Sequence, residues 1–202
     1  MSVIDIKNLT KDYGDQKGIF DISFFANAGE TVGFLGANGA GKTTTIRHLM
    51  GFIKPDRGCS EIFGMDCFRR AADIQKRIGY LPGEIAFMDH MSGMDFIRFM
   101  AEMKQMKDLG YAGELIDYLE LDPKVKLKKM SKGMKQKIAL VVAFMQDAPV
   151  LILDEPTSGL DPLMQNKFVE MIKEEQRKGK TILMSSHIFE EIENTCDRIV
   201  MI

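Results

Sequence analysis

Continuous runs of apolar residues mark the segments of this chain that we expect to be buried strands. The clearest runs are Thr31–Leu35, Val150–Leu153 and Thr181–Met184. Strands that are buried on both faces of a parallel sheet lack the polar–apolar alternation of half-exposed strands. Shorter or alternating segments predict five more strands, at Ser2–Ile6, Ile22–Ala26, Cys59–Phe63, Ile78–Leu81 and Arg198–Ile202. The first two of these precede the earliest long run, so we expect antiparallel β structure at the N-terminus.

Apolar residues at helical spacing fill the middle of the chain. They predict helices over Ser92–Met106 and Tyr111–Leu119, and a third helix that begins at Ser131, a residue type that caps helix N-termini well. Outside this region we expect helices at Thr44–Met50, Arg69–Arg77, Pro162–Lys178 and Ile188–Asn194. The pattern therefore predicts one α/β domain whose core spans 1–83 and 148–202, with a helical insertion over 84–147.

Segments rich in glycine, asparagine and aspartate separate these elements. We expect turns at Lys11–Gly14 and Lys54–Gly58, and a hairpin-like turn at Asn27–Glu30 that leads into the first long apolar run. The sequence stops inside the strand that begins at Arg198. A domain that ends within a strand predicts a chain that is truncated at its C-terminal end.

Composition favours a single-domain, soluble protein with no nucleic-acid partner. The 202 residues include 27 basic and 29 acidic side chains, a net charge of −2, whereas nucleic-acid binding calls for a strong basic excess. The three cysteines follow no metal-ligand spacing, which is typical of free thiols in a reducing compartment. Asp5 and Lys7 interrupt any N-terminal signal segment, and the longest apolar run, Ile138–Met145, is too short to span a bilayer.

The loop after Thr31–Leu35 has the composition of a phosphate-binding P-loop. It reads Gly36-Ala37-Asn38-Gly39-Ala40-Gly41-Lys42-Thr43. Glycines let the backbone turn tightly and direct successive N–H groups at an anion, and the following helix adds the positive end of its dipole. Lys42 can reach the β- and γ-phosphates of a nucleoside triphosphate, and the Thr43 hydroxyl can ligate Mg²⁺. The strand before and the helix after the loop argue against the alternative, an ordinary glycine-rich turn.

Two acids and a histidine follow the other long apolar runs. Asp154 and Glu155 come after the second run, and His187 comes shortly after the third. Ligands of parallel sheets bind beyond the carboxyl ends of the strands, so we expect these side chains near the P-loop. Asp154 is expected to hold Mg²⁺, directly or through water, and Glu155 to orient or deprotonate the attacking water. His187 is expected to hydrogen-bond the γ-phosphate or position the water. The alternatives are solvated loop acids and an ordinary histidine, which is our interpretation of the other two histidines.

The order of these motifs resembles that of ABC transporter nucleotide-binding subunits over essentially the whole chain. Ser131-Lys132-Gly133-Met134 resembles the signature motif, Leu153–Pro156 resembles Walker B, and Ser158–Asp161 follows in the expected place. Ile78–Glu84 and Ser131–Gln136 are most similar to bacterial exporters, whose ATP-binding subunit is a separate chain from the membrane subunit. The resemblance implies an ABC-type P-loop NTPase with a RecA-like parallel-sheet core, an N-terminal antiparallel β subdomain and a helical signature subdomain. It also implies Mg²⁺-dependent hydrolysis of ATP.

The resemblance assigns roles to residues outside the P-loop. Tyr13 would stack on adenine through its π face, and Thr44 would contact the α-phosphate. Ser131 and Gly133 would face the γ-phosphate bound by a second copy of the chain, where a helix N-terminus supplies N–H donors, and Asp161 would link the two sites. The simpler alternatives are a turn tyrosine at Tyr13 and a plain helix cap at Ser131. These roles imply an ATP-dependent homodimer in the cytoplasm, held at the inner face of the cell membrane by a permease subunit docked near residues 80–100.

Three positions depart from the family pattern. Lys132 and Met134 replace a Gly and a Gln of the usual signature Leu-Ser-Gly-Gly-Gln. Gly83 stands where the family commonly has the Q-loop glutamine, which helps to hold the metal and signals to the membrane subunit. Because glycine has no side chain for this role, we hypothesise that Glu84 or a water replaces the glutamine.

Other functions fit fewer of the motifs. Non-transport ABC proteins of translation usually carry two cassettes in one chain, and those of DNA repair are interrupted by long coiled coils, for which the insertion here lacks heptads. A GTPase would carry an Asn-Lys-x-Asp guanine motif, but Asn166-Lys167-Phe168-Val169 fails at its last position. A catalytically dead nucleotide-binding module would have no need of Glu155 and His187.

Overall fold

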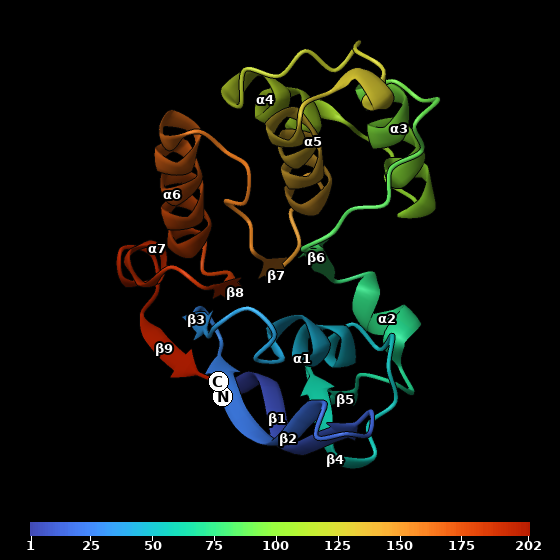
Figure 1. Cartoon of the computed structure of the whole chain (residues 1–202). Coiled ribbons are helices and arrows are strands. Elements are labelled where there is room, and N and C mark those ends of the chain that lie inside the picture. The colour runs from blue at the N-terminus through green and yellow to red at the C-terminus, as the bar shows by residue number, and fades with distance from the viewer.

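Five parallel strands form the central sheet of the protein (Figure 1). The computed structural model describes residues 1–202. In spatial order the strands are β6 (Ile78–Leu81), β7 (Val150–Asp154), β8 (Thr181–Ser186), β3 (Thr31–Leu35) and β9 (Arg198–Met201). Every residue of β7 and β8 is buried, which explains why both strands begin with a continuous apolar run in the sequence. The sheet confirms the predicted α/β fold class.

A second sheet is antiparallel and is built mainly from the N-terminal part of the chain. Its strands, in spatial order, are β2 (Gly18–Asn27), β1 (Ser2–Asp12), β4 (Arg57–Ile62) and β5 (Met65–Asp66). The predicted antiparallel region is therefore present. The sequence did not indicate β5, because two residues are too short to show any hydrophobic period.

One predicted turn is misplaced, and another is present but does not form a hairpin. β1 continues through Asp12, which pairs with Gly18 of β2, so the chain reverses over residues 14–17 and not at Lys11–Gly14. Asn27–Glu30 is not a hairpin turn, because β2 belongs to the antiparallel sheet whereas β3 pairs in parallel with β8 and β9. This segment instead carries the chain from one sheet to the other.

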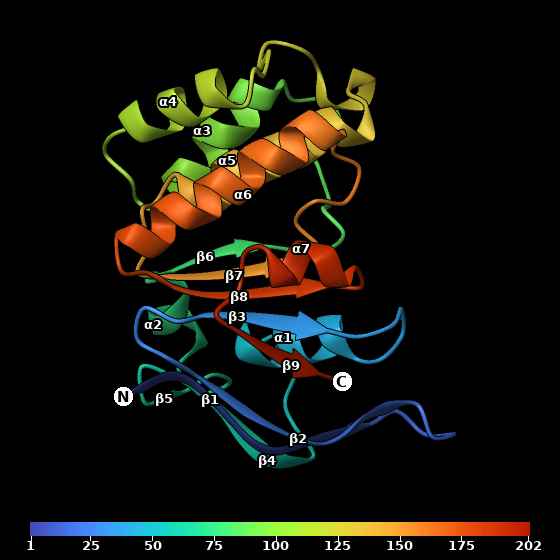
Figure 2. The ribbon, with the colours of Figure 1, turned by 90° about the vertical axis from the view of Figure 1, so that its left-hand side faces the viewer.

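Helices cover both faces of the central sheet (Figure 2). α1 (Lys42–Leu49) and α2 (Ala71–Gln75) lie on the side of the antiparallel sheet. α6 (Pro162–Arg177) lies on the opposite side, together with the inserted helices α3 (Gly93–Met103), α4 (Gly110–Tyr118) and α5 (Lys132–Phe144). A short 3₁₀ turn at Leu127–Lys129 precedes α5, and α7 (Phe189–Glu193) follows β8. None of these helices has both the length and the apolar character that crossing a membrane requires.

Two apolar clusters hold the layers together. One contains 29 buried residues and joins the inserted helices and α6 to the central sheet. The other contains 18 buried residues and fills the space between the two sheets around α1. Because α1 is fixed by this second cluster through Ile46 and Leu49, which are fully buried, the loop at its N-terminus is carried on a rigid support.

Candidate active site

The P-loop runs from the end of β3 to the first turn of α1. Gly41 is the cap residue of α1, at φ 107°, and it provides no side chain to bond the first-turn N–H groups. A Cβ at this position would lie 2.4 Å from the Ile19 Cγ2 atom, so both its backbone angle and its surroundings require glycine. The first turn of α1 also contains no acidic residue. The helix N-terminus is therefore free to bind an anion.

Lys42 is buried and points into its own loop. Its Nζ donates to the carbonyls of Gly36, at 2.6 Å, and Ala37, at 3.2 Å. The same nitrogen lies 3.3 Å from the Glu155 Oε1 atom, and only 6% of the Lys42 side chain is exposed. The ammonium charge is thus balanced by loop carbonyls and one carboxylate, which phosphate oxygens could replace.

Asp154 is the last residue of β7 and is fully buried. Its carboxylate accepts hydrogen bonds from two hydroxyl groups. Its Oδ2 accepts a hydrogen bond from the Thr43 Oγ1 at 2.7 Å, and its Oδ1 accepts one from the Ser185 Oγ at 2.6 Å. Thr43 and Asp154 thus bring together oxygen ligands of the kind that Mg²⁺ prefers, so they fit the metal role expected of them. Burial, with a further contribution from the Asp154 charge, raises the pKa of Tyr80 to about 12.

Glu155 and His187 form a contact between the loops that follow β7 and β8. The His187 Nδ1 lies 2.7 Å from the Glu155 Oε2 atom. Glu155 adopts a left-handed backbone conformation, at φ 50°, which is uncommon for a residue with a side chain. Its N–H donates to the Ser185 Oγ at 3.0 Å. Glu155 therefore lies between the Lys42 ammonium and the His187 ring, with its backbone fixed by β8.

A cavity of about 350 Å³ at the P-loop brings together most of the predicted binding residues. The residues that line it are Tyr13, Gly18, Ala37, Asn38, Gly39, Gly41, Lys42, Thr43, Thr44 and Glu155. Tyr13 is 55% exposed, as a ring that is available for stacking should be. Ser131, Gly133 and Asp161 do not line this cavity.

The signature-like segment packs against the loop that follows Walker B. The Ser131 Oγ caps α5 by accepting the Met134 N–H at 3.2 Å, and the Lys132 Nζ donates to the Ser158 Oγ at 2.9 Å. A Cβ on Gly133 would lie 2.8 Å from the Gly159 carbonyl oxygen, so this close approach requires glycine. Within one chain, the first turn of α5 therefore contacts residues 158–159.

The remaining predicted positions lie near these loops. The Asp161 Oδ1 caps α6 by accepting the Met164 N–H at 3.0 Å. Gly83 lies against Asp154, since a Cβ there would be 3.0 Å from the Asp154 Oδ2. Glu84, in contrast, is exposed.

Sequence reasoning missed three polar residues that hold the site together. Ser185 bonds both Asp154 and the Glu155 backbone, the Gln136 side chain donates to the Pro156 carbonyl at 2.7 Å, and Glu191 binds two hydroxyl groups described below. The one available signal was the position of Ser185 at a strand end, where polar residues were expected to matter.

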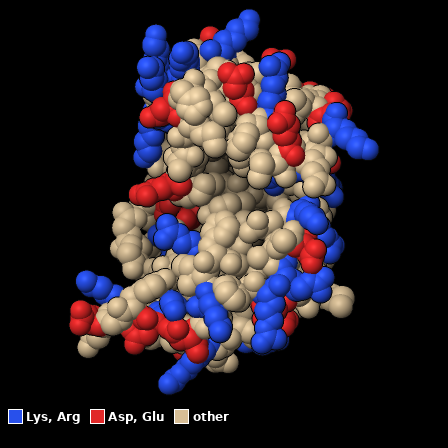
Figure 3. Space-filling model, turned by 90° about the vertical axis from the view of Figure 1, so that its right-hand side faces the viewer, with Lys and Arg blue, Asp and Glu red and all other residues tan.

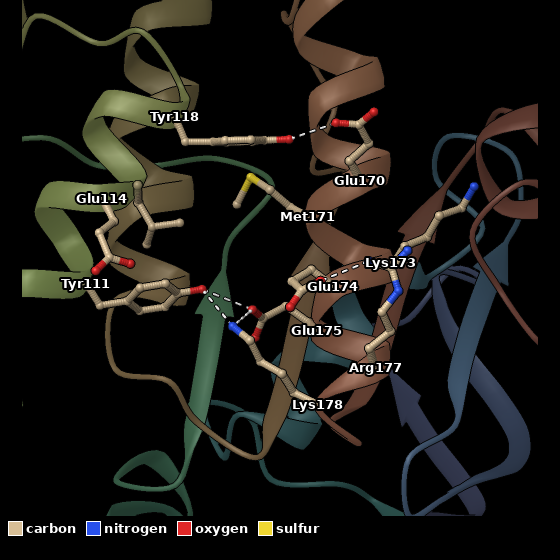
Figure 4. Close-up of a pocket in the computed structure, with 11 residues that line it drawn as sticks. Tyr111, Glu114, Tyr118, Glu170, Met171, Lys173, Glu174, Glu175, Arg177 and Lys178 are labelled. Carbon is tan, nitrogen blue, oxygen red and sulfur yellow. Dashed lines mark hydrogen bonds and ion pairs between the residues drawn. The ribbon is translucent and has the colours of Figure 1, made fainter.

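A larger cavity, of about 610 Å³, lies elsewhere, between α4 and α6 (Figure 4). Its polar groups pair with one another: the Tyr111 hydroxyl with Glu175 at 3.0 Å, and the Tyr118 hydroxyl with Glu170 at 3.2 Å. These tyrosines connect the helical insertion to α6, so we interpret the cavity as a junction between the two parts of the domain.

Comparison with known proteins matches this geometry to one family. The family described as ABC transporter matches residues 19–158. ABC transporter ATP-binding protein NatA of Bacillus subtilis (strain 168) is 35% identical over 196 residues, which cover 92% of this chain and 78% of NatA. Nod factor export ATP-binding protein I of Burkholderia orbicola (strain AU 1054) is 36% identical over 205 residues, which cover 98% of this chain and 67% of that protein.

Solved structures agree with the fold. A structure of the ATP binding subunit of an ABC transporter gives a TM-score of 0.89 at 31% identity, and covers 100% of this chain and 86% of that chain. A dimeric ATP-binding cassette in a post-hydrolysis state, bound to ADP and Pi, gives a TM-score of 0.87 at 22% identity, over 98% and 94% of the two chains. The fold and the site define a P-loop ATPase of the ABC type. The chain belongs to the ABC transporter family, as an ATP-binding subunit.

Proposed function

We propose that this chain is the ATP-hydrolysing subunit of an exporter, and that it works as an ATP-dependent homodimer on a separate permease. The observation that carries the proposal is the Lys42–Glu155–His187 cluster, with Thr43 and Asp154 beside it at the strand ends. The name of the Nod factor export protein supports export as the direction of transport. The location that follows is cytoplasmic, at the inner face of the membrane through the permease.

Each residue of the cluster has a part in the proposed mechanism. Lys42 exchanges the carbonyls of its loop for the β- and γ-phosphates of ATP. Thr43 and Asp154 would hold Mg²⁺, which would supply positive charge to neutralise the phosphates. Glu155 orients the attacking water and accepts its proton, and His187 hydrogen-bonds the γ-phosphate. Catalysis arises mainly from positioning and charge stabilisation.

A second copy of the chain completes each ATP site in this proposal. Ser131 and Gly133 do not line the P-loop cavity of their own chain, so a partner is needed to bring the N-terminus of α5 to the phosphates. Asp161, near the same surface, links the two sites. Residues 84–147 then act as the signature subdomain.

The permease docks, in this proposal, near residues 80–100. On this face of the molecule a hollow lies between the helical insertion and the sheets, and its visible walls are mostly free of charged side chains (Figure 3). Apolar side chains are exposed in the region, among them Phe52 (56%) and Met88 (37%). The Phe52 ring contacts the Tyr80 ring edge-on, at 5.9 Å between centroids. Such a surface suits an apolar segment of a protein partner.

The Glu155→Gln substitution tests the proposal. Glutamine keeps the size of the side chain but cannot accept the proton of water, so ATP should bind while kcat falls at least about 100-fold. The protein should then accumulate as a dimer in the presence of ATP and Mg²⁺, as measured by size-exclusion chromatography with light scattering. Glu193→Gln, an exposed position on α7, is the matched control. Turnover at the wild-type rate in Glu155→Gln would refute the assignment of the base. Co-purification of the trapped protein with a membrane protein tests the transport role.

A further inference from the structure

The loops that carry Glu155 and His187 are tied together on two sides. On the side of the sheet, Ser185 bonds Asp154 and the Glu155 backbone. On the other side, the tie comes from α7, through the carboxylate of Glu191. Glu191 lies outside every motif found in the sequence.

Each oxygen of the Glu191 carboxylate accepts one hydroxyl. Oε1 accepts from the Thr157 Oγ1 at 2.7 Å, and Oε2 accepts from the Ser186 Oγ at 2.7 Å. Thr157 is only 6% exposed and Ser186 is fully buried. Hydrogen bonds to an ionised carboxylate are stronger than those between neutral groups, and no lysine, arginine or histidine pairs with this one. Hydrogen bonds from these two hydroxyl groups therefore stabilise the negative charge of Glu191.

The two hydroxyl groups flank the catalytic contact. Thr157 is two residues after Glu155, and Ser186 immediately precedes His187. The Ser186 Oγ also accepts the Ile188 N–H at 3.0 Å, on the far side of His187. Glu191 thus fixes both loops within one or two residues of the 2.7 Å contact between Glu155 and His187.

The left-handed backbone conformation of Glu155 requires hydrogen bonds, such as those to Glu191, that restrain the loop. A non-glycine residue at φ 50° persists only where the surrounding structure over-determines its conformation. The turn that follows is closed by the Ser158 N–H, which donates to the Glu155 carbonyl at 3.1 Å, and the Leu160 N–H, which donates to the Thr157 carbonyl at 3.0 Å. Anchoring Thr157 therefore restrains the whole segment from Glu155 to Leu160.

We propose that Glu191 is a positioning residue for ATP hydrolysis. Through Thr157 and Ser186, it fixes the Glu155 loop and the His187 loop in position relative to each other. The catalytic part of this inference rests on the proposed function. Because the anchored segment continues to the residues that contact the first turn of α5, the same tie also sets the surface presented to a second copy of the chain.

Steady-state ATPase kinetics of Glu191→Ala and Glu191→Gln test the inference. Displacing a general base by about 1 Å can cost roughly 100-fold, so Glu191→Ala should lower kcat about 10- to 100-fold. The KM for ATP should stay within about twofold, because Lys42 and the P-loop backbone, which bind the phosphates in the proposed function, do not contact Glu191. Glutamine can still hydrogen-bond both hydroxyls, so Glu191→Gln should restore most of kcat. Glu193→Ala, an exposed substitution on the same helix, should leave both constants unchanged.

Hydrogen exchange measured by mass spectrometry on the full chain gives a second readout that needs no turnover. In Glu191→Ala, peptides that cover 155–160 should exchange faster, while those that cover the P-loop should not. A kcat for Glu191→Ala within twofold of wild type, an equal loss in Glu193→Ala, or unchanged exchange over 155–160 would overturn the inference. If the wild-type chain itself hydrolyses no ATP, the proposed function fails, and the exchange result still decides whether Glu191 holds the loop.

Discussion

His48 lies on α1 and is 1% exposed, and neither of its ring nitrogens has a hydrogen-bond partner. Burial lowers the pKa of this histidine below its ordinary value of 6.5, although a polar backbone group of Ile53 and the charge of Asp56 oppose the effect, and Lys11 adds to it. The unfolded chain binds a proton below about pH 6.5 that the folded chain does not bind. Stability therefore falls as the pH drops below about 6.5, by up to about 1.4 kcal/mol per pH unit.

Urea unfolding at several pH values between 7.5 and 5.5 checks this expectation. His48→Leu should lose this part of the pH dependence, since leucine has no proton to bind and the buried ring makes no hydrogen bond that leucine would break. His90→Ala, at an exposed position, should keep the full dependence. A His48→Leu protein whose stability falls with pH as steeply as wild type would show that other groups cause the loss.

Individual functional residues were predictable from sequence where a strand end fixes their position. Asp154, Glu155 and His187 follow buried apolar runs, and parallel strands bring their carboxyl ends to one edge of the sheet. Ser185 could not be assigned in this way. Its role depends on the register in which Asp154 of β7 pairs with Ser185 of β8, and nothing local specifies that register. Glu191 depends in the same way on where α7 packs.

Among the elements, α6 is joined to its surroundings by a buried ion cluster. Glu175 on α6 is 2% exposed and contacts the Lys180 ammonium, which is 6% exposed and also lies 2.5 Å from Asp147. Tyr111 of α4 donates to the same glutamate at 3.0 Å. Removing Glu175 leaves the buried Lys180 ammonium with only Asp147, whose side chain is 63% exposed, as a carboxylate partner. Glu175→Ala should therefore destabilise the fold by about 3–5 kcal/mol.

Urea denaturation of three variants measures the change in the free energy of unfolding. Glu174→Ala removes an exposed carboxylate from the same helix and should change stability by less than about 0.5 kcal/mol. Glu175→Leu combined with Lys180→Met removes both charges and should recover much of the loss. A loss below about 1 kcal/mol in Glu175→Ala would mean that Asp147 alone satisfies Lys180.

Elements with a strong hydrophobic pattern were predictable, and the links between them were not. The five parallel strands and the three inserted helices follow from continuous apolar runs and helical spacing, both of which depend only on neighbouring residues. The sheet to which β2 belongs depends on long-range pairing with β1, so the turn after β2 was mistaken for a hairpin. β5 has too few residues for any period to appear.

At the scale of the whole molecule, each proposed ATP site is shared between two copies of the chain, and this sharing can be tested with pairs of variants. Lys42 lines the P-loop cavity and Ser131 does not, so a working site would take one residue from each copy of the chain. Lys42→Ala removes the phosphate-binding cation. Ser131→Asp keeps an oxygen that can cap α5 but places a negative charge where the partner's γ-phosphate would lie. Each variant alone should lose nearly all ATPase activity, because both sites of a symmetric dimer carry the defect.

Mixing the two variants should restore activity. A heterodimer contains one site in which both changes meet and one site that takes Lys42 from the Ser131→Asp chain and Ser131 from the Lys42→Ala chain. Half of the dimers in an equal mixture are heterodimers, so about a quarter of wild-type turnover should return if the sites act independently. A site formed within one chain would give no recovery, since neither variant has both residues intact. ATPase activity measured across mixing ratios, with a maximum near equal amounts, therefore distinguishes a shared site from two separate ones.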